Sequence, residues 1–142
     1  MTTLPCMCAS FRRAARMLTQ VYDDALRPAG LRATQFTLLQ ALSLAVEVNQ
    51  GELAHLLAMD STTLTRNLRL LVRQGWIESR PGADQRERRL RLSASGERKL
   101  KRATHRWESA QAQLRARLGD GRWRELLQIS TELTTTLQNQ QI

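Results

Sequence analysis

The stretch that decides the fold is Asp60–Gly75, with the sequence DSTTLTRNLRLLVRQG. Asp60 and Ser61 are typical helix N-caps, because their side-chain oxygens accept hydrogen bonds from the free N–H groups of the first turn. Gly75 tolerates the left-handed conformation in which many helices end. Apolar residues recur between these ends at helical spacing and predict one buried face, formed by Leu64, Leu68, Leu71 and Val72.

The other face of this predicted helix carries hydroxyl, amide and guanidinium groups and no acidic residue. Such groups bind the phosphates and the major-groove base edges of DNA. A solvated basic helix face is the alternative interpretation. The residues of this helix that we expect to contact DNA are Ser61, Thr62, Thr63, Thr65, Arg66, Asn67, Arg69 and Arg73.

The flanking sequence favours DNA binding. A short helix is predicted over Gly51–Ala58, and a tight connection then leads into the basic helix, which is the order of a helix-turn-helix. Alternating strands are predicted over Trp76–Arg80 and Arg88–Leu92, with turn residues after the first of them. Two strands placed here predict a wing, whose expected DNA contacts are Asp84, Arg86 and Arg88.

Composition narrows the class of protein. The 142 residues include 22 Lys or Arg and 13 Asp or Glu, a net charge of +9, which suits a polyanionic partner. The sequence holds neither a signal-peptide core nor an apolar run of the ~20 residues that span a bilayer, so we expect a cytoplasmic protein without membrane contact. It also lacks a phosphate loop, a carboxylate pair and a zinc ligand set, and we therefore expect no enzyme, no metal and no cofactor.

The remaining segments predict four further helices: Cys6–Leu26, Gln35–Leu44 with Thr34 as its cap, Ala94–Leu118, and Arg122–Leu137. The first helix and the last two have apolar faces larger than a small winged unit can cover, which indicates a homodimer. The predicted fold is mainly α, with a winged helix-turn-helix between dimerisation helices. The predicted boundaries are 1–32 for the N-terminal helix, 33–93 for the winged unit and 94–142 for the C-terminal helices.

This order of elements resembles the MarR family of bacterial transcription regulators over nearly the whole chain. The residues that carry the resemblance are GELAHLLAMDSTTLTRNLRLLVRQGWIESRPGADQRERRLRLSASG, Gly51–Gly96. The resemblance implies a two-fold homodimer that binds double-stranded DNA at a palindromic operator, with the recognition helix in the major groove and the wing over the minor groove. It also implies that Asp84 orients an arginine, and that the protein is a repressor released by an effector.

A possible sensor lies near the N-terminus. Cys8 looks like the reactive cysteine of the organic hydroperoxide-sensing branch of the family, and Tyr22 matches a tyrosine that would hydrogen-bond its thiolate. Two further tyrosines of that branch are replaced by Arg12 and Ala33, which favours a different oxidant or an electrophile. Small hydrophobic packing residues are the alternative for both Cys6 and Cys8.

Three alternatives remain open at this stage. Cys6 and Cys8 form a Cys-x-Cys pair that would suit a soft metal ion and a metal-responsive regulator. A phenolic effector would instead occupy a pocket between helices, lined by Phe11, Met17 or Phe36. A non-specific nucleoid-type protein would share the basic charge but would bind every duplex alike.

Overall fold

The computed structural model describes residues 5–140, so the ends of the predicted terminal segments, 1–4 and 141–142, lie outside the described residues. The elements follow one another along the chain as α1 (Met7–Leu26), a 3₁₀ turn η1 (Arg27–Ala29), α2 (Ala33–Ala45), β1 (Val48–Asn49), α3 (Gln50–Leu56), α4 (Ser61–Arg73), β2 (Ile77–Pro81), β3 (Arg88–Leu92), α5 (Ala94–Leu118) and α6 (Asp120–Asn139). The predicted mainly helical, winged helix-turn-helix fold is confirmed.

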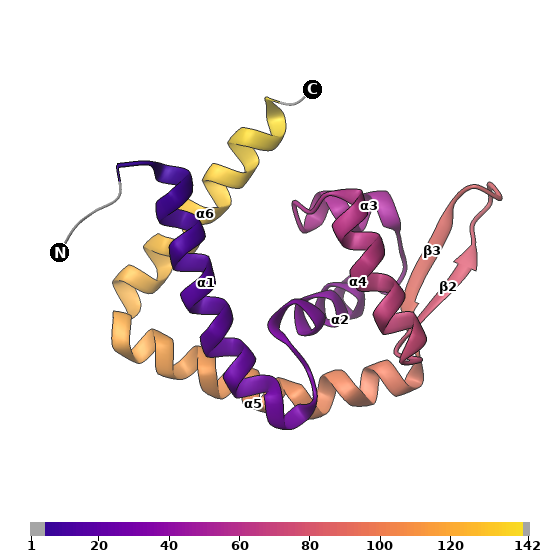
Figure 1. The fold of residues 1–142 in the computed structure, drawn as a ribbon, viewed down its shortest axis with the longest axis horizontal. Helices are drawn as coiled ribbons and strands as arrows, with labels where there is room; N and C mark the ends of the chain where they lie inside the picture. The colour runs from indigo at the N-terminus through magenta and orange to yellow at the C-terminus, as the bar shows by residue number, and fades with distance from the viewer. Residues whose placement is uncertain (1–4, 141–142) are drawn as a thin grey trace.

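The winged unit and the terminal helices occupy opposite ends of the molecule. α3, α4 and the β2–β3 hairpin lie at one end, and α1, α6 and the second half of α5 lie at the other (Figure 1). α5 is long enough to link them, since it packs on α2 and β3 in the winged unit and on α1 and α6 beyond it. The winged unit and the terminal helices are therefore joined by one continuous helix.

α2 forms the centre of the core. Phe36, Leu38, Leu39 and Leu42 are fully buried on several of its sides, because α2 lies between α4 and α5 (Figure 1). A helix that packs on more than one side buries more than a single apolar stripe. The Phe36 ring stacks on Trp107 of α5 with 5.5 Å between ring centroids. Each such side chain contributes about 1.5–3 kcal/mol through burial.

The sheet has three antiparallel strands in the order β1-β3-β2. Leu90 in the central strand is buried and lies opposite Val48 of β1 and Ser79 of β2. The prediction included only the hairpin and missed β1, because a strand of two residues shows no periodicity. The register matters for the site below, since it also places Arg89 opposite Asn49.

Several predicted helix boundaries differ from the observed ones by one or two residues, and three of these differences have a clear local feature beside them. α2 begins at Ala33 rather than after Thr34, because Asp23 accepts the Ala33 N–H at 2.7 Å. α3 ends at Leu56, and the chain turns at Ala58 with a positive φ of 48°. α6 begins at Asp120, so Gly119 alone breaks the chain between α5 and α6.

The terminal helices expose much of their apolar surface. Leu26 is the only residue of α1 that is buried, and α6 has no buried residue. The large apolar side chains exposed on these two helices are Met7, Phe11, Met17, Leu18, Val21, Leu126, Leu127, Ile129 and Leu137. This surface has no partner within residues 5–140. No helix in that range is long and apolar enough to cross a membrane.

Candidate DNA-binding surface

The N-terminus of α4 is capped by Asp60. Its carboxylate accepts the Thr63 N–H at 2.9 Å and also the Thr63 hydroxyl. These hydrogen bonds, that of the hydroxyl first, lower the pKa of Asp60 from its usual value of 3.8. Gly75, just beyond the helix, has a φ of 76°. Both predicted end signals of this helix are therefore present in the structure.

One face of α4 is open to solvent, and its opposite face is anchored in the core by Leu64, Leu68 and Leu71. The open face is slightly hollowed, and the residues that line the hollow are Ser61, Thr62, Thr65, Arg66 and Arg69. We call these five residues the reading face. Neither Arg66 nor Arg69 forms an ion pair with any described residue, so their guanidinium groups are available to a ligand.

Three polar side chains of α4, one of them on the reading face, have hydrogen bonds within the protein. Thr63 is half-buried and serves the cap, and Asn67, also half-buried, donates to the Thr63 carbonyl at 2.9 Å. Thr65 donates to the Ser61 carbonyl and accepts from Gln50 Nε2, both at 2.7 Å. Thr65 therefore links α4 to α3 while lying on the reading face. Arg73 is exposed at the far end of the helix.

The wing turn is ordered by Asp84. Its carboxylate accepts the backbone N–H of Arg86 at 3.1 Å, and its carbonyl accepts the Glu87 N–H at 2.9 Å. Gly82 closes the turn by donating to the Glu87 carbonyl at 2.7 Å. The Asp84 carboxylate thus binds the backbone of Arg86, and the expectation that it orients an arginine in contact with DNA stays a prediction.

The five arginines of the wing fall into two groups. Arg91 pairs with Glu78 at 2.7 Å, Arg80 approaches the same carboxylate at 3.6 Å, and Arg89 has its own acidic neighbours. Arg86 and Arg88 are exposed, and no ion pair to either is found among residues 5–140. The predicted wing contacts are therefore the arginines whose charge is free.

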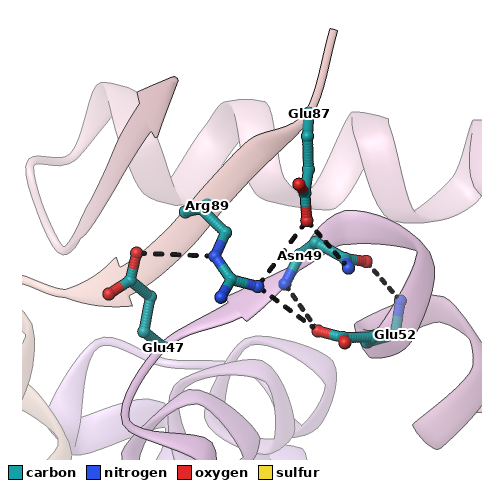
Figure 2. Close-up of polar contacts among 5 residues, drawn as sticks. All are labelled: Glu47, Asn49, Glu52, Glu87 and Arg89. Atoms are coloured by element: carbon teal, nitrogen blue, oxygen red, sulfur yellow. Dashed lines mark hydrogen bonds and ion pairs between the residues drawn. The ribbon is translucent and has the colours of Figure 1, made fainter. Parts of the chain in front are cut away.

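Arg89 lies at the base of the wing among three carboxylates (Figure 2). Its guanidinium nitrogens lie 3.7 Å from Glu47, 3.8 Å from Glu52 and 3.6 Å from Glu87. The sequence predicted Arg89 only as part of the strand Arg88–Leu92 and did not indicate this network. The alternation of β3 was the available signal, because successive side chains of a strand point to opposite sides and Arg88 and Arg89 must therefore diverge.

The end of the wing is locked to the start of α5. Ser93 caps α5 by accepting the Gly96 N–H at 3.0 Å, and its hydroxyl donates to the Gly75 carbonyl at 2.6 Å. The Ser93 N–H donates to the Trp76 carbonyl at 3.0 Å. Gly96 lies directly against that carbonyl, where a Cβ atom would be only 2.0 Å from the oxygen. These contacts explain why serine at position 93 and glycine at position 96 suit the start of α5.

The predicted sensor residues do not converge within one chain. Cys6 and Cys8 are exposed at the start of α1. Tyr22 lies fourteen residues further along the same helix, about 21 Å from Cys8 at 1.5 Å per residue. The Tyr22 hydroxyl donates instead to Gln111 of α5, and burial raises the pKa of Tyr22. A bond between Tyr22 and the Cys8 thiolate is thus absent within the chain.

The other effector sites that we considered gain no support from the structure. Phe36 is a core residue, whereas Phe11 and Met17 are exposed, so these three do not line one pocket. A search of the described residues found no group of three or more His, Cys, Asp or Glu side chains that would hold a metal ion. A metal bound by Cys6 and Cys8 would need ligands from elsewhere.

Comparisons with known proteins agree with this geometry. Residues 29–87 match the model of the MarR family. An uncharacterized HTH-type transcriptional regulator of Bacillus subtilis, YwoH, is 30% identical over 87 residues, which are 61% of this chain and 64% of YwoH. The match therefore spans just under two thirds of that relative.

Solved structures extend the likeness to almost the whole chain. The transcriptional regulator MosR of M. tuberculosis, solved in complex with DNA, is 39% identical with a TM-score of 0.87, over 96% of this chain and 99% of MosR. A mutant of E. coli MarR complexed with operator DNA shares the fold at 22% identity, with a TM-score of 0.79 over 87% of this chain and 89% of that protein. On these matches and the winged helix-turn-helix described above, the chain belongs to the MarR family of transcriptional regulators.

Proposed function

We propose that this protein is a homodimeric, sequence-specific regulator that binds a palindromic DNA operator and acts as a repressor. The observation that carries the proposal is the reading face of α4, where unpaired guanidinium groups stand beside hydroxyls at a helix N-terminus. Hydroxyls and N–H groups at such an end bind phosphates. Arg66 is expected to bind a guanine edge with two hydrogen bonds.

The wing supplies the second part of the proposed contact. Arg86 and Arg88 are exposed and unpaired, and they lie on the hairpin that projects beside α4 (Figure 1). Cations on such a hairpin suit the minor groove, where the negative potential of DNA is strong. MosR, 39% identical over 96% of this chain, was solved in complex with DNA, which supports DNA binding by this chain.

The apolar faces of α1 and α6 support the dimer. Many large apolar side chains exposed on the same two helices indicate an interface. A second copy related by a two-fold axis would cover it and would place two reading faces against the two halves of a palindrome.

Binding measured by fluorescence anisotropy tests sequence-specific reading. The probe is an operator selected by the protein from random duplexes, with a scrambled duplex of equal length as reference. We expect the operator to be preferred by ~10³-fold or more at physiological salt. Arg66→Ala should lower operator affinity by about 1–3 kcal/mol and relax the preference at one base pair.

Arg98→Ala is the matched control for that experiment. Arg98 is an exposed arginine of α5 outside the reading face, and its replacement removes the same formal charge. Equal affinity of the wild-type protein for both duplexes would replace the proposal by the nucleoid-type alternative. Equal losses for Arg66→Ala and Arg98→Ala would show that Arg66 contributes charge and reads no base.

For the effector, we propose an oxidant or an electrophile that reacts at Cys8. Both Cys8 and Cys6 are exposed at the end of α1, one of the two helices that carry the proposed interface. A hydroperoxide would transfer one oxygen atom to the Cys8 thiolate, giving a sulfenic acid and releasing the alcohol. A new polar group at that end of α1 would disturb the dimer and hence the spacing of the two reading faces.

Operator binding is measured in the reduced protein and again after cumene hydroperoxide, with Cys8→Ser and Cys6→Ser side by side. We expect oxidation to release the wild type and the Cys6 variant but not the Cys8 variant. Release of both variants would move the reaction away from Cys8. If the wild type does not respond, the cysteines are packing residues, and a soft metal or a phenolic ligand becomes the effector to test.

A further inference from the structure

We infer that Arg89 is a positioning residue, which holds the wing against the start of α3 so that Arg86 and Arg88 can reach DNA. Arg89 itself would not contact DNA. The inference rests on the proposed function, since it assumes that the wing binds DNA. It assigns Arg89 a role different from that of the neighbouring Arg88, whose side chain lies on the other side of the strand.

The geometry of Arg89 is that of a bridge. Its guanidinium group lies 3.6–3.8 Å from carboxylate oxygens on three different segments, and its side chain is 38% exposed. Glu47 precedes β1, Glu52 belongs to α3, and Glu87 ends the wing turn. Each distance is longer than that of a close ion pair, so the effect of Arg89 depends on holding the three segments together.

Further hydrogen bonds connect this bridge to the helix-turn-helix (Figure 2). Asn49 caps α3 by accepting the Glu52 N–H at 2.8 Å, and Glu52 accepts the Asn49 N–H at 3.0 Å. The Asn49 side chain also donates to Glu87 at 3.1 Å. The wing turn, the α3 cap and Arg89 therefore form one network of polar contacts.

The network continues to the reading face. Gln50, the first residue of α3, donates to Thr65 of α4 at 2.7 Å. A displacement of the wing base would therefore act on the α3 cap and on the contact between α3 and α4. Arg89 is the one cation of this cluster, in which three carboxylates surround it. Its loss would leave those carboxylates facing one another without a counter-charge.

A double-mutant cycle separates positioning from direct contact. Arg86→Ala, Arg89→Ala and the double variant are compared for affinity to the selected operator duplex and for the slope of log K against log salt. If Arg89 acts through the wing, Arg89→Ala should weaken binding by at least as much as Arg86→Ala, because both wing arginines lose their position, and the double variant should bind no more weakly than Arg89→Ala alone. The salt slope of Arg89→Ala should fall by about one for each wing phosphate contact that is lost, although Arg89 touches no phosphate.

Glu87→Ala discriminates most sharply, because it makes the protein more positive. Simple electrostatics predicts tighter DNA binding for this variant, whereas loss of the network predicts weaker binding. We expect weaker binding. Arg98→Ala is the control for loss of one positive charge, and Arg89→Lys, which keeps the charge without the planar fork, should lie between the wild type and Arg89→Ala.

The outcomes are distinct. If the fold-losses in affinity of Arg86→Ala and Arg89→Ala multiply in the double variant, or if Glu87→Ala binds DNA more tightly than the wild type, Arg89 is not a positioning residue. The wing would still be a DNA contact. If Arg86→Ala and Arg88→Ala both bind as the wild type does, the wing does not contact DNA, and that part of the proposed function falls together with the inference. Circular dichroism confirms that each variant is folded, and Glu87→Ala and Arg89→Lys provide the test if Arg89→Ala is not.

Discussion

Replacing Gly96 by alanine should destabilise the protein, although alanine is the better helix former. A Cβ atom at this position would lie 2.0 Å from the Trp76 carbonyl oxygen, 2.9 Å from the carbonyl carbon and 3.2 Å from Cα. Carbon–oxygen contacts in proteins are usually about 3.3 Å or longer. The start of α5 or the Trp76 backbone must therefore move by on the order of 1 Å to reach that distance.

The movement would strain the bonds that join α5 to the wing. Ser93 holds both segments through its N–H bond to the Trp76 carbonyl and its hydroxyl bond to the Gly75 carbonyl. Overpacking lowers the free energy of unfolding by about 1–3 kcal/mol, and a lost hydrogen bond lowers it by about 1 kcal/mol more. The better helix propensity of alanine raises it by up to about 1 kcal/mol. Because the contact is with backbone, we expect the upper part of that range, about 2–3 kcal/mol of unfolding free energy.

Urea denaturation followed by circular dichroism measures this loss, at one fixed protein concentration because the stability of a dimer depends on concentration. Gly121→Ala is the matched control, since Gly121 also lies in the first turn of a helix and a Cβ there would meet no atom within 4 Å. It should be neutral or more stable by up to about 1 kcal/mol. Equal stability of Gly96→Ala and the wild type would refute the close-approach argument.

Three further outcomes test the cap, the α1–α5 contact and the interface. Asp60→Ala should lower the free energy of unfolding at neutral pH, because it removes the cap of α4. The pKa of Asp60 in the folded protein lies below 3.8, so the difference from the wild type is lost as the pH falls through that lowered pKa. Denaturation curves at several pH values measure this. Tyr22→Phe removes the hydrogen bond to Gln111 and should lower the free energy of unfolding by about 1 kcal/mol. Because the pKa of Tyr22 is raised above 10.0, the stabilisation by Tyr22 is present below pH 10.0 and is lost as the pH rises further. Alkaline denaturation curves measure this loss. Leu126→Glu on the apolar side of α6 should weaken the proposed dimer by on the order of a hundredfold, whereas Thr135→Glu on the opposite, polar side should not, as measured by analytical ultracentrifugation.

Features that depend on neighbouring residues were predictable from the sequence. α4 was expected between the Asp60 cap and Gly75, and it extends over Ser61–Arg73. α5 was expected at Ala94–Leu118 and has those bounds, because Ser93 caps it and Gly119 ends it. In each case the apolar spacing and the end signals lie within the helix or next to it. The reading face follows from the same periodicity.

Features that depend on distant pairing were not predictable in the same way. β1 has two residues, and only its pairing with β3 makes it a strand. The acidic partners of Arg89 come from three segments that this pairing brings together. Cys8 and Tyr22 match residues of the hydroperoxide-sensing branch in type, but residue type alone does not show which groups each side chain contacts. The partner of Tyr22 is 89 positions away in the sequence.

The distribution of charge shows why net charge alone does not locate the reading face. α5 contains seven Arg or Lys and two Glu, whereas α4 contains three Arg and no acidic residue. Much of the net charge of +9 thus lies on the connecting helix, below α2 and away from the wing tip in Figure 1. Such charge raises the affinity for any polyanion and steers its approach.

Discrimination between DNA sequences must come from few groups, those whose hydrogen-bonding atoms are unpaired and held in place. Arg66 and Arg69 meet both conditions because leucines anchor the opposite face of their helix, and Arg86 and Arg88 meet them only as long as the network around Arg89 holds the wing.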